Sequence, residues 1–193
     1  NSAVFPGNGT WTLLTGQGAI TDVNDPQTAI TGLAVGDNAF TWTIFNGACG
    51  TTVDTVHIVV YDGNLAIADA GADQELCSPV DSTSLAASAA PYPASGAWTV
   101  ISGTGSFADA SDPNTSVTGF TPGVNTYEWS VSNGPCGSTT DQVSITLFDG
   151  SLTSASAGPD QNICGPVAST PMAATAVTAP ATGQWSIVSG PEI

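Results

Sequence analysis

The sequence contains no lysine and no arginine, and its single histidine is the only side chain that could carry a positive charge near neutral pH. Its 16 aspartates and glutamates give a formal net charge of −16 at pH 7. Proteins that bind nucleic acid or anionic lipid headgroups use cationic side chains to reach the phosphates. The composition therefore excludes both kinds of partner, and it leaves divalent cations, basic proteins, or no charged partner at all.

Long apolar runs and helical periodicity are also missing. We find no apolar run at helical spacing longer than a few residues, and no signal peptide, transmembrane span or lipidation motif. An internal stretch of a longer chain would carry none of these segments, so we infer no compartment from their absence, and we expect no direct membrane insertion. An apolar fraction of 41% with five tryptophans still predicts packed cores rather than a disordered acidic tail.

The sequence does have an internal repeat with a period of 87 residues and no insertion or deletion. Trp11 recurs at Trp98 and again at Trp185. The same interval separates further pairs: Trp42 and Trp129, Cys49 and Cys136, Cys77 and Cys164, Asn46-Gly47 and Asn133-Gly134, Asp25-Pro26 and Asp112-Pro113. A fixed period of this length predicts a tandem array of one module.

The period divides the chain into one complete and two partial copies. Residues 66–152 form the complete module, residues 1–65 lack the opening strands, and residues 153–193 hold the opening strands only. Residue 1 corresponds to positions 88 and 175. We therefore expect the sequence to be a window onto a longer array.

Alternation of apolar and polar residues with a period of two predicts antiparallel strands in the complete copy. Strands are expected at residues 83–86, 96–101, 116–120, 127–132 and 143–147. Asn133-Gly134 predicts a tight turn between the last two. Some seven short strands separated by frequent turns are typical of an immunoglobulin-like sandwich. We predict an all-β fold of tandem immunoglobulin-like β-sandwich modules that bury Trp98 and Trp129 between their sheets.

The four cysteines occupy two positions of the repeat and predict a disulfide framework. We favour a bridge from Cys77, on the opening strand, to Cys136, just past the last hairpin turn, with Cys49 and Cys164 paired outside the window. Such a bridge would close a loop of about 60 residues and contribute roughly 4 kcal/mol. Pairing of Cys49 with Cys77, which would join adjacent modules, stays open because connectivity cannot be read from sequence. Disulfides would indicate an oxidising, extracytoplasmic location.

Several motifs together resemble a known repeat type. They are Ala70-Gly71-Ala72-Asp73-Gln74-Glu75-Leu76-Cys77 with its echo at residues 157–164, Gly96-Ala97-Trp98, Asp112-Pro113-Asn114, Tyr127-Glu128-Trp129, Asn133-Gly134-Pro135-Cys136 and Asp141-Gln142-Val143. This combination resembles the Ig-like/PKD-like tandem repeats of giant cell-surface adhesins of Bacteroidota, including SprB-like gliding-motility-associated proteins. The resemblance implies an extracellular, cell-anchored fibre exported by the type IX secretion system and used in adhesion or gliding.

Clustered carboxylates give a candidate calcium site. Asp22, Asn24 and Asp25 in the first copy, and Asp109, Ser111 and Asp112 in the second, present oxygen atoms at nearby positions of one loop. A second group lies at the junction of these copies: Asp62, Asp69, Asp73 and Glu75. Calcium there would neutralise repulsion and stiffen the joint. The competing interpretation is that these are turn residues and solubilising charges, since calcium takes about six to eight oxygen ligands.

A catalytic role finds little support. His57 is the only candidate general base near neutral pH, and the second copy has Ser144 at its position. His57 alternates with Val56 and Ile58, so we interpret it as a solvated strand residue and predict no enzyme and no cofactor other than calcium. Two Asp-Ser/Thr tripeptides resemble the sites at which Bacteroidota attach O-glycans, which makes Thr55 and Ser82 candidate glycosylation sites.

The sequence thus favours a non-catalytic structural repeat of a long extracellular adhesin or surface fibre. Its modules would act as rigid spacers in cell-surface adhesion or gliding. The expected partners are neighbouring modules of the same chain, and surface glycans or other cells at the tip of the fibre. The alternatives are a glycan- or protein-binding module and an accessory module of a secreted enzyme.

Overall fold

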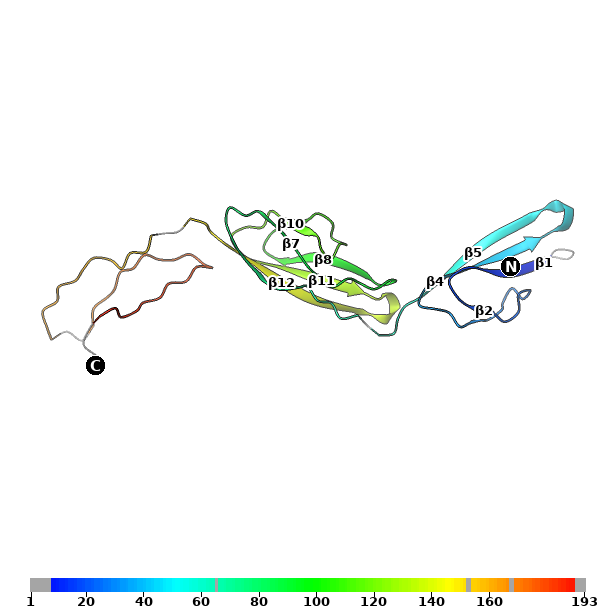
Figure 1. Ribbon diagram of the computed structural model, residues 1–193, viewed down its shortest axis with the longest axis horizontal. Helices are drawn as coiled ribbons and strands as arrows, with labels where there is room; N and C mark the ends of the chain where they lie inside the picture. The colour runs from blue at the N-terminus through cyan, green and yellow to red at the C-terminus, as the bar shows by residue number, and fades with distance from the viewer. Residues whose placement is uncertain (1–7, 65, 152–153, 167–168, 190–193) are drawn as a thin grey trace. The chain divides into compact units, whose positions relative to one another are not determined.

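The computed structural model describes residues 8–64, 66–151, 154–166 and 169–189, and their regular structure is β-strand apart from two short 3-10 turns (Figure 1). The strands of the first copy are β1 (Asn8–Thr15), β2 (Ala19–Ile20), β3 (Ile30–Thr31), β4 (Gly36–Phe45) and β5 (Thr51–Val60). Those of the middle copy are β6 (Gln74–Cys77), β7 (Ser82–Ser84), β8 (Ser95–Ser102), β9 (Ser106–Phe107), β10 (Ser116–Thr118), β11 (Gly123–Ser132) and β12 (Ser138–Phe148). The predicted all-β fold class is confirmed.

In both copies the longest strands follow the period-two alternation of the sequence. Along β11 the buried residues are Asn125, Tyr127, Trp129 and Val131, and the residues between them face outward or are partly exposed. Successive side chains of a strand point to opposite faces, so this pattern directs one apolar face of the sheet inward. The predicted burial of Trp98 and Trp129 is confirmed, because they are 3% and 0% exposed.

The hairpins of the two copies close through 3-10 turns, η1 (Gly47–Cys49) and η2 (Gly134–Cys136). The turn expected at Asn133-Gly134 lies at the start of the connection between β11 and β12, in which the Asn133 N–H donates to the Gly137 carbonyl at 2.8 Å. Gly134 and Gly137 have φ angles of 55° and 113°. These values lie in the left-handed region, where glycine carries no steric penalty.

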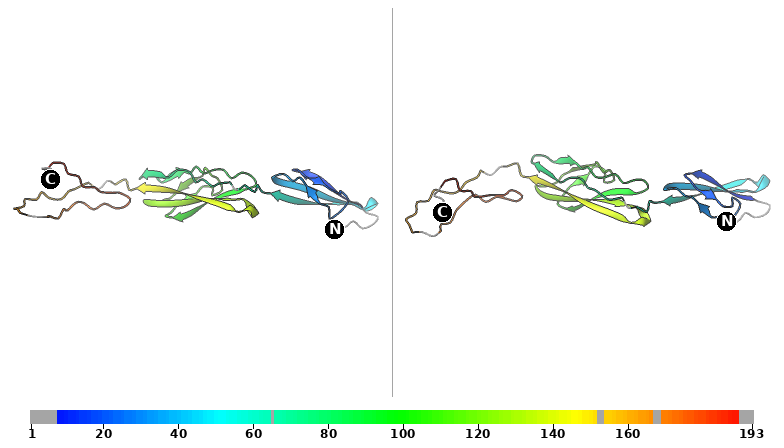
Figure 2. Two further views of the ribbon diagram at one scale, coloured as in Figure 1. Left: turned by 90° about the horizontal axis from the view of Figure 1, so that it is seen from below. Right: turned by 60° about the horizontal axis from the view of Figure 1, so that its bottom comes forward.

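The middle copy is a sandwich of two sheets with strand orders β6-β12-β11-β8 and β7-β10-β9. The views in Figure 2 show its strands stacked in two layers. β6 runs parallel to β12, from the pair Gln74 and Ile145 to the pair Cys77 and Phe148. The core between the sheets is made of Leu85, Trp98, Val117, Tyr127, Trp129, Val131, Val143, Ile145 and Leu147. This arrangement is an immunoglobulin-like β-sandwich.

The first copy contains fewer strands. Its sheets are β1-β4-β5 and the pair β2-β3, and β4 and β5 pair along their full lengths. Among the described residues, no strand pairs with β5 on the side away from β4, whereas β12, its counterpart in the middle copy, pairs with β6 there.

Residues 8–69, 88–97 and 129–141 make up one compact unit, and residues 70–87, 98–128 and 142–189 make up another. The boundary between them passes through the middle copy. The predicted module boundaries fall at residues 65, 152 and 153, which lie outside the described residues. The division into modules 1–65, 66–152 and 153–193 therefore stays a prediction.

The C-terminal segment, residues 154–166 and 169–189, carries no assigned strand, and it is the orange and red trace of Figure 1. Within the described part of the chain, no helix is long and apolar enough to span a membrane.

Candidate functional site

The acidic loops of the two copies are turns held together by their own carboxylates. Asp22 Oδ1 accepts the Asn24 N–H and Asp25 Oδ1 accepts the Gln27 N–H, both at 2.9 Å. In the middle copy Asp109 Oδ1 accepts the Ser111 N–H at 2.8 Å, and Asp112 Oδ1 accepts the Asn114 N–H at 2.9 Å. These are Asx turns, in which a short acidic side chain replaces a backbone acceptor.

A threonine and a tryptophan fix each loop from inside. The Trp11 and Trp98 Nε1–H groups donate to the carbonyls of Asp25 and Asp112, at 3.1 and 3.2 Å. Thr115 Oγ1 accepts the Asp109 N–H at 2.9 Å, as Thr28 Oγ1 does for Asp22 at 2.8 Å in the first copy. The Ser111 hydroxyl also donates to Asp109 at 2.7 Å, and its hydrogen bonds hold the pKa of Asp109 below the ordinary value of 3.8.

The carboxylates predicted at the junction are spread along the chain. Asp62 Oδ1 accepts the Asn64 N–H at 2.9 Å, and Asp73 Oδ1 accepts the Ser144 N–H of β12 at 2.8 Å. The Asp69 N–H donates to Ser88 Oγ at 3.0 Å, and Glu75 lies exposed on β6. The described residues include no group of three or more His, Cys, Asp or Glu side chains arranged to hold a metal ion. Calcium binding stays a prediction.

The fold separates the two cysteines that were predicted to form a bridge. Cys77 pairs with Phe148 at the end of β12, whereas Cys136 lies in the hairpin turn before Ser138, at its beginning. The ten residues between these ends span about 33 Å, and a disulfide needs Cα atoms within about 7 Å. All four cysteines are free and exposed. The prediction of a Cys77 to Cys136 bridge within one module is therefore wrong for this fold, because β6 runs parallel to β12.

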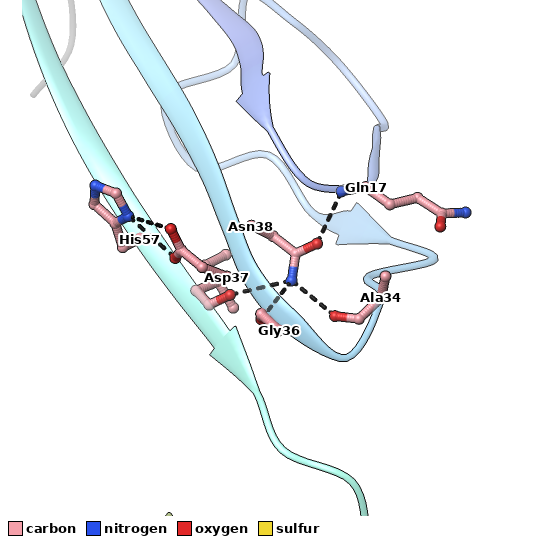
Figure 3. Close-up of polar contacts among 7 residues, drawn as sticks. Gln17, Ala34, Gly36, Asp37, Asn38 and His57 are labelled. Carbon is pink, nitrogen blue, oxygen red and sulfur yellow. Dashed lines mark hydrogen bonds and ion pairs between the residues drawn. The ribbon is translucent and has the colours of Figure 1, made fainter. Parts of the chain in front are cut away.

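His57 pairs across the sheet with Asp37 (Figure 3). Its Nδ1 lies 2.9 Å from Asp37 Oδ2, and the two side chains are 59% and 31% exposed. The interpretation of His57 as a solvated strand residue agrees with this position. An exposed pair of this kind contributes little to stability.

A buried asparagine clamp, which the sequence interpretation missed, recurs in both copies. Asn38 Nδ2 donates to the carbonyls of Ala34, Gly36 and Ile58, and its Oδ1 accepts the Gln17 N–H at 2.9 Å (Figure 3). Asn125 does the same with Thr121, Gly123, Ile145 and the Thr104 N–H. Both are 1% exposed. The sequence signal for this clamp was an asparagine that recurs after 87 residues, at a position where the alternation of the strand places a buried side chain.

The first copy has an open cleft of about 270 Å³. Its lining includes Trp11, Pro26, Trp42, Ile44, Thr52 and Val56. The Trp42 Nε1–H is buried and has no hydrogen-bond partner among the described residues, whereas the Trp129 Nε1–H donates to the Ser88 carbonyl at 2.9 Å. The counterpart of Ser88 in the first copy is residue 1, which lies outside the described residues.

The candidate glycosylation sites both lie on the surface. Thr55 is exposed on β5, and Ser82 is exposed at the start of β7. Their accessibility is what an enzyme that attaches a glycan requires, and the modification itself stays a prediction.

Comparison with known proteins gives structural neighbours only. No protein-family model matches the chain, and no curated protein matches it. Among solved structures, the PKD domain from the KIAA 1837 protein is 27% identical, with 49% of this chain and 98% of that chain covered and a TM-score of 0.40. Mouse cadherin-23 EC22-24 is 16% identical, with coverages of 73% and 53% and a TM-score of 0.32. The tandem Ig repeats of Dlar are 8% identical, with coverages of 74% and 83% and a TM-score of 0.33. We base the fold on the strand order and the core described above, and not on these low scores.

Proposed function

We propose that the chain is part of a non-catalytic extracellular array whose modules act as rigid spacers in a long surface adhesin or fibre. The observation that carries this proposal is where the residues shared by the two copies lie. Tryptophans at 42 and 129 are buried, asparagines at 38 and 125 clamp the strands, and aspartates at 25 and 112 close the turns. Each shared feature serves the scaffold.

Several exposed positions differ between the copies. Phe45 is 50% exposed and its counterpart is Ser132, and His57 corresponds to Ser144. The partner of His57, Asp37, corresponds to Val124. A module that bound one ligand at every repeat would need the same exposed side chains in each copy, whereas a spacer needs only the same interior. The difference therefore supports the spacer.

The finer assignments rest on the sequence resemblance described above. They place the array outside the cell, on the surface of a member of the Bacteroidota, in adhesion or gliding motility, after export by type IX secretion. Consecutive copies of constant length would repeat one rotation and translation, as in other repeat arrays.

A glycan- or protein-binding module, or an accessory module of a secreted enzyme, is the second candidate. The observation that favours it is the open cleft lined by Trp11 and Trp42, whose rings lie 5.0 Å apart. Aromatic rings that line a cleft can stack on sugars, although Trp42 itself is only 8% exposed. In the middle copy the tryptophan that corresponds to Trp42 donates its indole N–H to the Ser88 carbonyl instead.

Single-molecule stretching of the chain, combined with a glycan array, separates the two candidates. The spacer predicts a force peak for the middle copy, with a gain in contour length of roughly 300 Å for about 87 residues, less its folded length, and no saturable binding on the array. Trp129→Ala is the control that should abolish the peak. Saturable binding of one glycan by the intact chain, lost in Trp11→Ala, would favour the binding module and contradict the spacer.

Calcium and O-glycans are separate proposals that the same protein can test. If calcium bridges Asp22 and Asp25, or Asp109 and Asp112, the melting temperature should be higher in calcium than in chelator by mass action. Asp22→Asn together with Asp25→Asn should remove the rise in the first copy. An identical melting curve in chelator and in calcium would contradict calcium binding by these loops. Glycans at Thr55 and Ser82 would appear as added mass on protein purified from the native host.

A further inference from the structure

The hairpin tips of the two copies have the same backbone conformation but different surroundings. Asn46 has φ and ψ angles of −118° and 49°, and Asn133 has −105° and 41°. Each donates its N–H to the carbonyl of the glycine that ends the turn, Gly50 or Gly137, at 2.9 and 2.8 Å. Asn46 is nevertheless exposed, whereas Asn133 is only 5% exposed. Because the two tips fold alike, the burial of Asn133 comes from residues outside its own hairpin.

The residues that follow β5 cover the hairpin tip of the middle copy. Asn133 Nδ2 donates to the Asp62 carbonyl at 2.6 Å. The Tyr61 ring lies against Gly134, because a Cβ at that glycine would be 2.5 Å from the ring. A Cβ at Gly47, the counterpart of Gly134, would have no described atom within 4 Å. All of these residues belong to one compact unit, in which the end of the first copy is seated on the tip of the middle copy.

A second tyrosine makes the reverse contact within the same unit. Tyr92 of the middle copy lies beside Gly36, the first residue of β4, where a Cβ would be 3.3 Å from the ring. A Cβ at Gly123, the counterpart of Gly36, would have no described atom within 4 Å. Tyr92 is 71% exposed, so its ring is not packed in the core of its own copy. Tyr61 thus reaches from the first copy to the middle copy, and Tyr92 reaches back.

Hydrogen bonds anchor the linker between the copies on both sides. Asp62 Oδ1 accepts the Asn64 N–H at 2.9 Å, which makes an Asx turn just after β5. On the side of the middle copy, Thr139 Oγ1 donates to the Ala66 carbonyl at 2.7 Å and accepts the Ala68 N–H at 3.0 Å. These anchors reduce the number of conformations open to the linker, and they lower the entropic cost of holding the two copies together.

Both halves of this contact recur in the sequence. Tyr61-Asp62-Gly63 returns as Phe148-Asp149-Gly150, and Asn133-Gly134 has its counterpart in Asn46-Gly47. Neither asparagine caps its own 3-10 turn with its side chain. The hairpin therefore does not itself require the asparagine amide, and an Asp-Gly turn does not require an aromatic residue before it. A contact between copies accounts for both, because it uses the amide and the ring.

We propose that the hairpin tip of each copy is a docking site for the aromatic-Asp-Gly segment that ends the copy before it, and that this contact locks the joint. Between the first and middle copies, Asn133 holds the backbone of Asp62, and Gly134 leaves room for the Tyr61 ring. The lock is made of side-chain and backbone contacts and needs no calcium. Its biological purpose rests on the proposed function, since a stiff joint is what a spacer requires.

Two glycines provide a matched test of the docking site. Gly134 and Gly47 share a φ of 55°, so alanine meets a left-handed backbone at either position. At Gly134 the added methyl group also displaces the Tyr61 ring. Gly134→Ala should therefore release the joint, whereas Gly47→Ala should leave it closed. Asn133→Ala against Asn46→Ala makes the same comparison for the side-chain amide.

NMR of the intact chain, in reducing buffer with chelator, measures the joint directly. In the wild type, residual dipolar couplings from the strands of both copies should fit one alignment tensor, and the Tyr61 ring should show nuclear Overhauser contacts to Gly134. Gly134→Ala and Tyr61→Ala should lose both signals. Phe45→Ala, which removes a half-exposed ring elsewhere in the first copy, is the control and should keep them. Unchanged chemical shifts along β11 and β12 would show that the middle copy remains folded in each variant.

A double-mutant cycle separates docking from a local loss of stability. Gly134→Ala should lower the melting temperature more in the wild type than in the Tyr61→Ala background, where no ring is left to displace. The backbone penalty of the substitution, including the effect of the following Pro135, is present in both backgrounds and cancels. An equal loss in the two backgrounds would show that Tyr61 does not dock at Gly134 and would overturn the proposal.

Two further results would overturn the lock. One is a wild-type chain whose copies need two separate alignment tensors in chelator, and the other is a joint on which Gly134→Ala and Gly47→Ala have the same effect. Failure of the lock is distinguishable from failure of the spacer. A released joint leaves the force peak and the glycan array unchanged, whereas a glycan bound by a chain with a locked joint would contradict the spacer alone.

Discussion

The first and middle copies place equivalent side chains on the same strands, and among the described residues β12 has β6 as a neighbour whereas β5 has β4 alone. Val143 and Ile145 of β12 are 1% and 0% exposed, whereas Val56 of β5 is 40% exposed and Ile58 is partly exposed. The strands β4 and β5 still pair along their full lengths. Strand pairing in this module is therefore local, and burial depends on an opening segment that lies far away along the chain.

Substitution of the central tryptophan should give the largest difference between the copies. Trp129 is fully buried and hydrogen-bonded, so Trp129→Ala should cost about 3–5 kcal/mol of unfolding free energy. Trp42→Ala should cost clearly less, because that ring lines an open cleft and its N–H has no described partner. Urea unfolding followed by circular dichroism, with hydrogen exchange to assign the copy, measures both values. Equal losses would show that the first copy is closed in solution.

Replacing the clamp asparagine should lower the unfolding free energy of the two copies by similar amounts, because Asn38 and Asn125 make the same hydrogen bonds. Asn125→Asp removes the donors and sets a carboxylate against three carbonyl oxygens, at a cost of about 3 kcal/mol at pH 7. This arrangement raises the pKa of the new acid in the folded state. The penalty should therefore be small below its unfolded pKa of about 3.9 and should grow as the pH rises.

Thermal melts of Asn38→Asp and Asn125→Asp at acidic and neutral pH check this expectation. The exposed Asn46→Asp serves as the control. A large loss in one copy only would contradict the view that the clamp makes equivalent stabilising contacts in both copies.

The local part of this structure could be predicted from the sequence, and the long-range part could not. Alternation gave the strands at 127–132 and 143–147, and the Asp-Pro signal gave the turns at residues 22–28 and 109–115, because both depend on neighbouring residues. The direction in which β6 runs has no local signal. Parallel pairing moves Cys77 to the far end of β12, and for this reason the predicted bridge to Cys136 was wrong.

The candidate site was missed for a related reason. From the sequence alone, Asn125 resembles a turn residue. Only the structure shows that its buried side chain donates to carbonyls from two separate segments of the chain. In contrast, the repeat of 87 positions in the sequence was sufficient to match the loop and clamp contacts of the middle copy to those of the first.

Adding or removing one hydroxyl group should change the unfolding free energy of the two copies by a smaller amount. Tyr127 Oη donates to the Thr104 carbonyl at 2.6 Å, and the first copy has Phe40 at this position. Tyr127→Phe should cost about 1 kcal/mol, and Phe40→Tyr should be close to neutral because the hydroxyl can reach the corresponding carbonyl. Burial raises the pKa of Tyr127 above 10.0. Its stabilising contribution is therefore complete below that pH and is lost as the pH rises toward the folded pKa.

Chemical unfolding of the two variants at neutral and alkaline pH gives the two free energies and their pH dependence. Wild type should lose stability above pH 10 in the middle copy, and Tyr127→Phe should lose less. An unchanged alkaline profile in Tyr127→Phe would show that other groups cause the loss.

The smallest effect concerns the acidic loop, where Asn24 of the first copy is replaced by Ser111 in the middle copy. The Ser111 hydroxyl is the main cause of the lowered pKa of Asp109, and the first copy has Asn24 in its place. Ser111→Ala should therefore raise the pKa of Asp109 toward its ordinary value of 3.8. Because the folded pKa is the lower one, the contribution of Asp109 to stability is present above pH 3.8 and is lost as the pH falls through the folded pKa. The backbone N–H of Ser111 still donates to Asp109 in the variant, so the shift should be incomplete.

Carbon-detected NMR titration of the side-chain carboxyl measures this pKa directly, and Asp149 supplies the internal comparison. Its pKa is also lowered, but there the largest cause is the backbone N–H of Ser151, with the hydroxyl second. Ser151→Ala should therefore move the pKa of Asp149 less than Ser111→Ala moves that of Asp109. If the two shifts were equal, the backbone would dominate both turns. The hydroxyl of Ser111 would then add nothing that distinguishes the loop of the middle copy from that of the first.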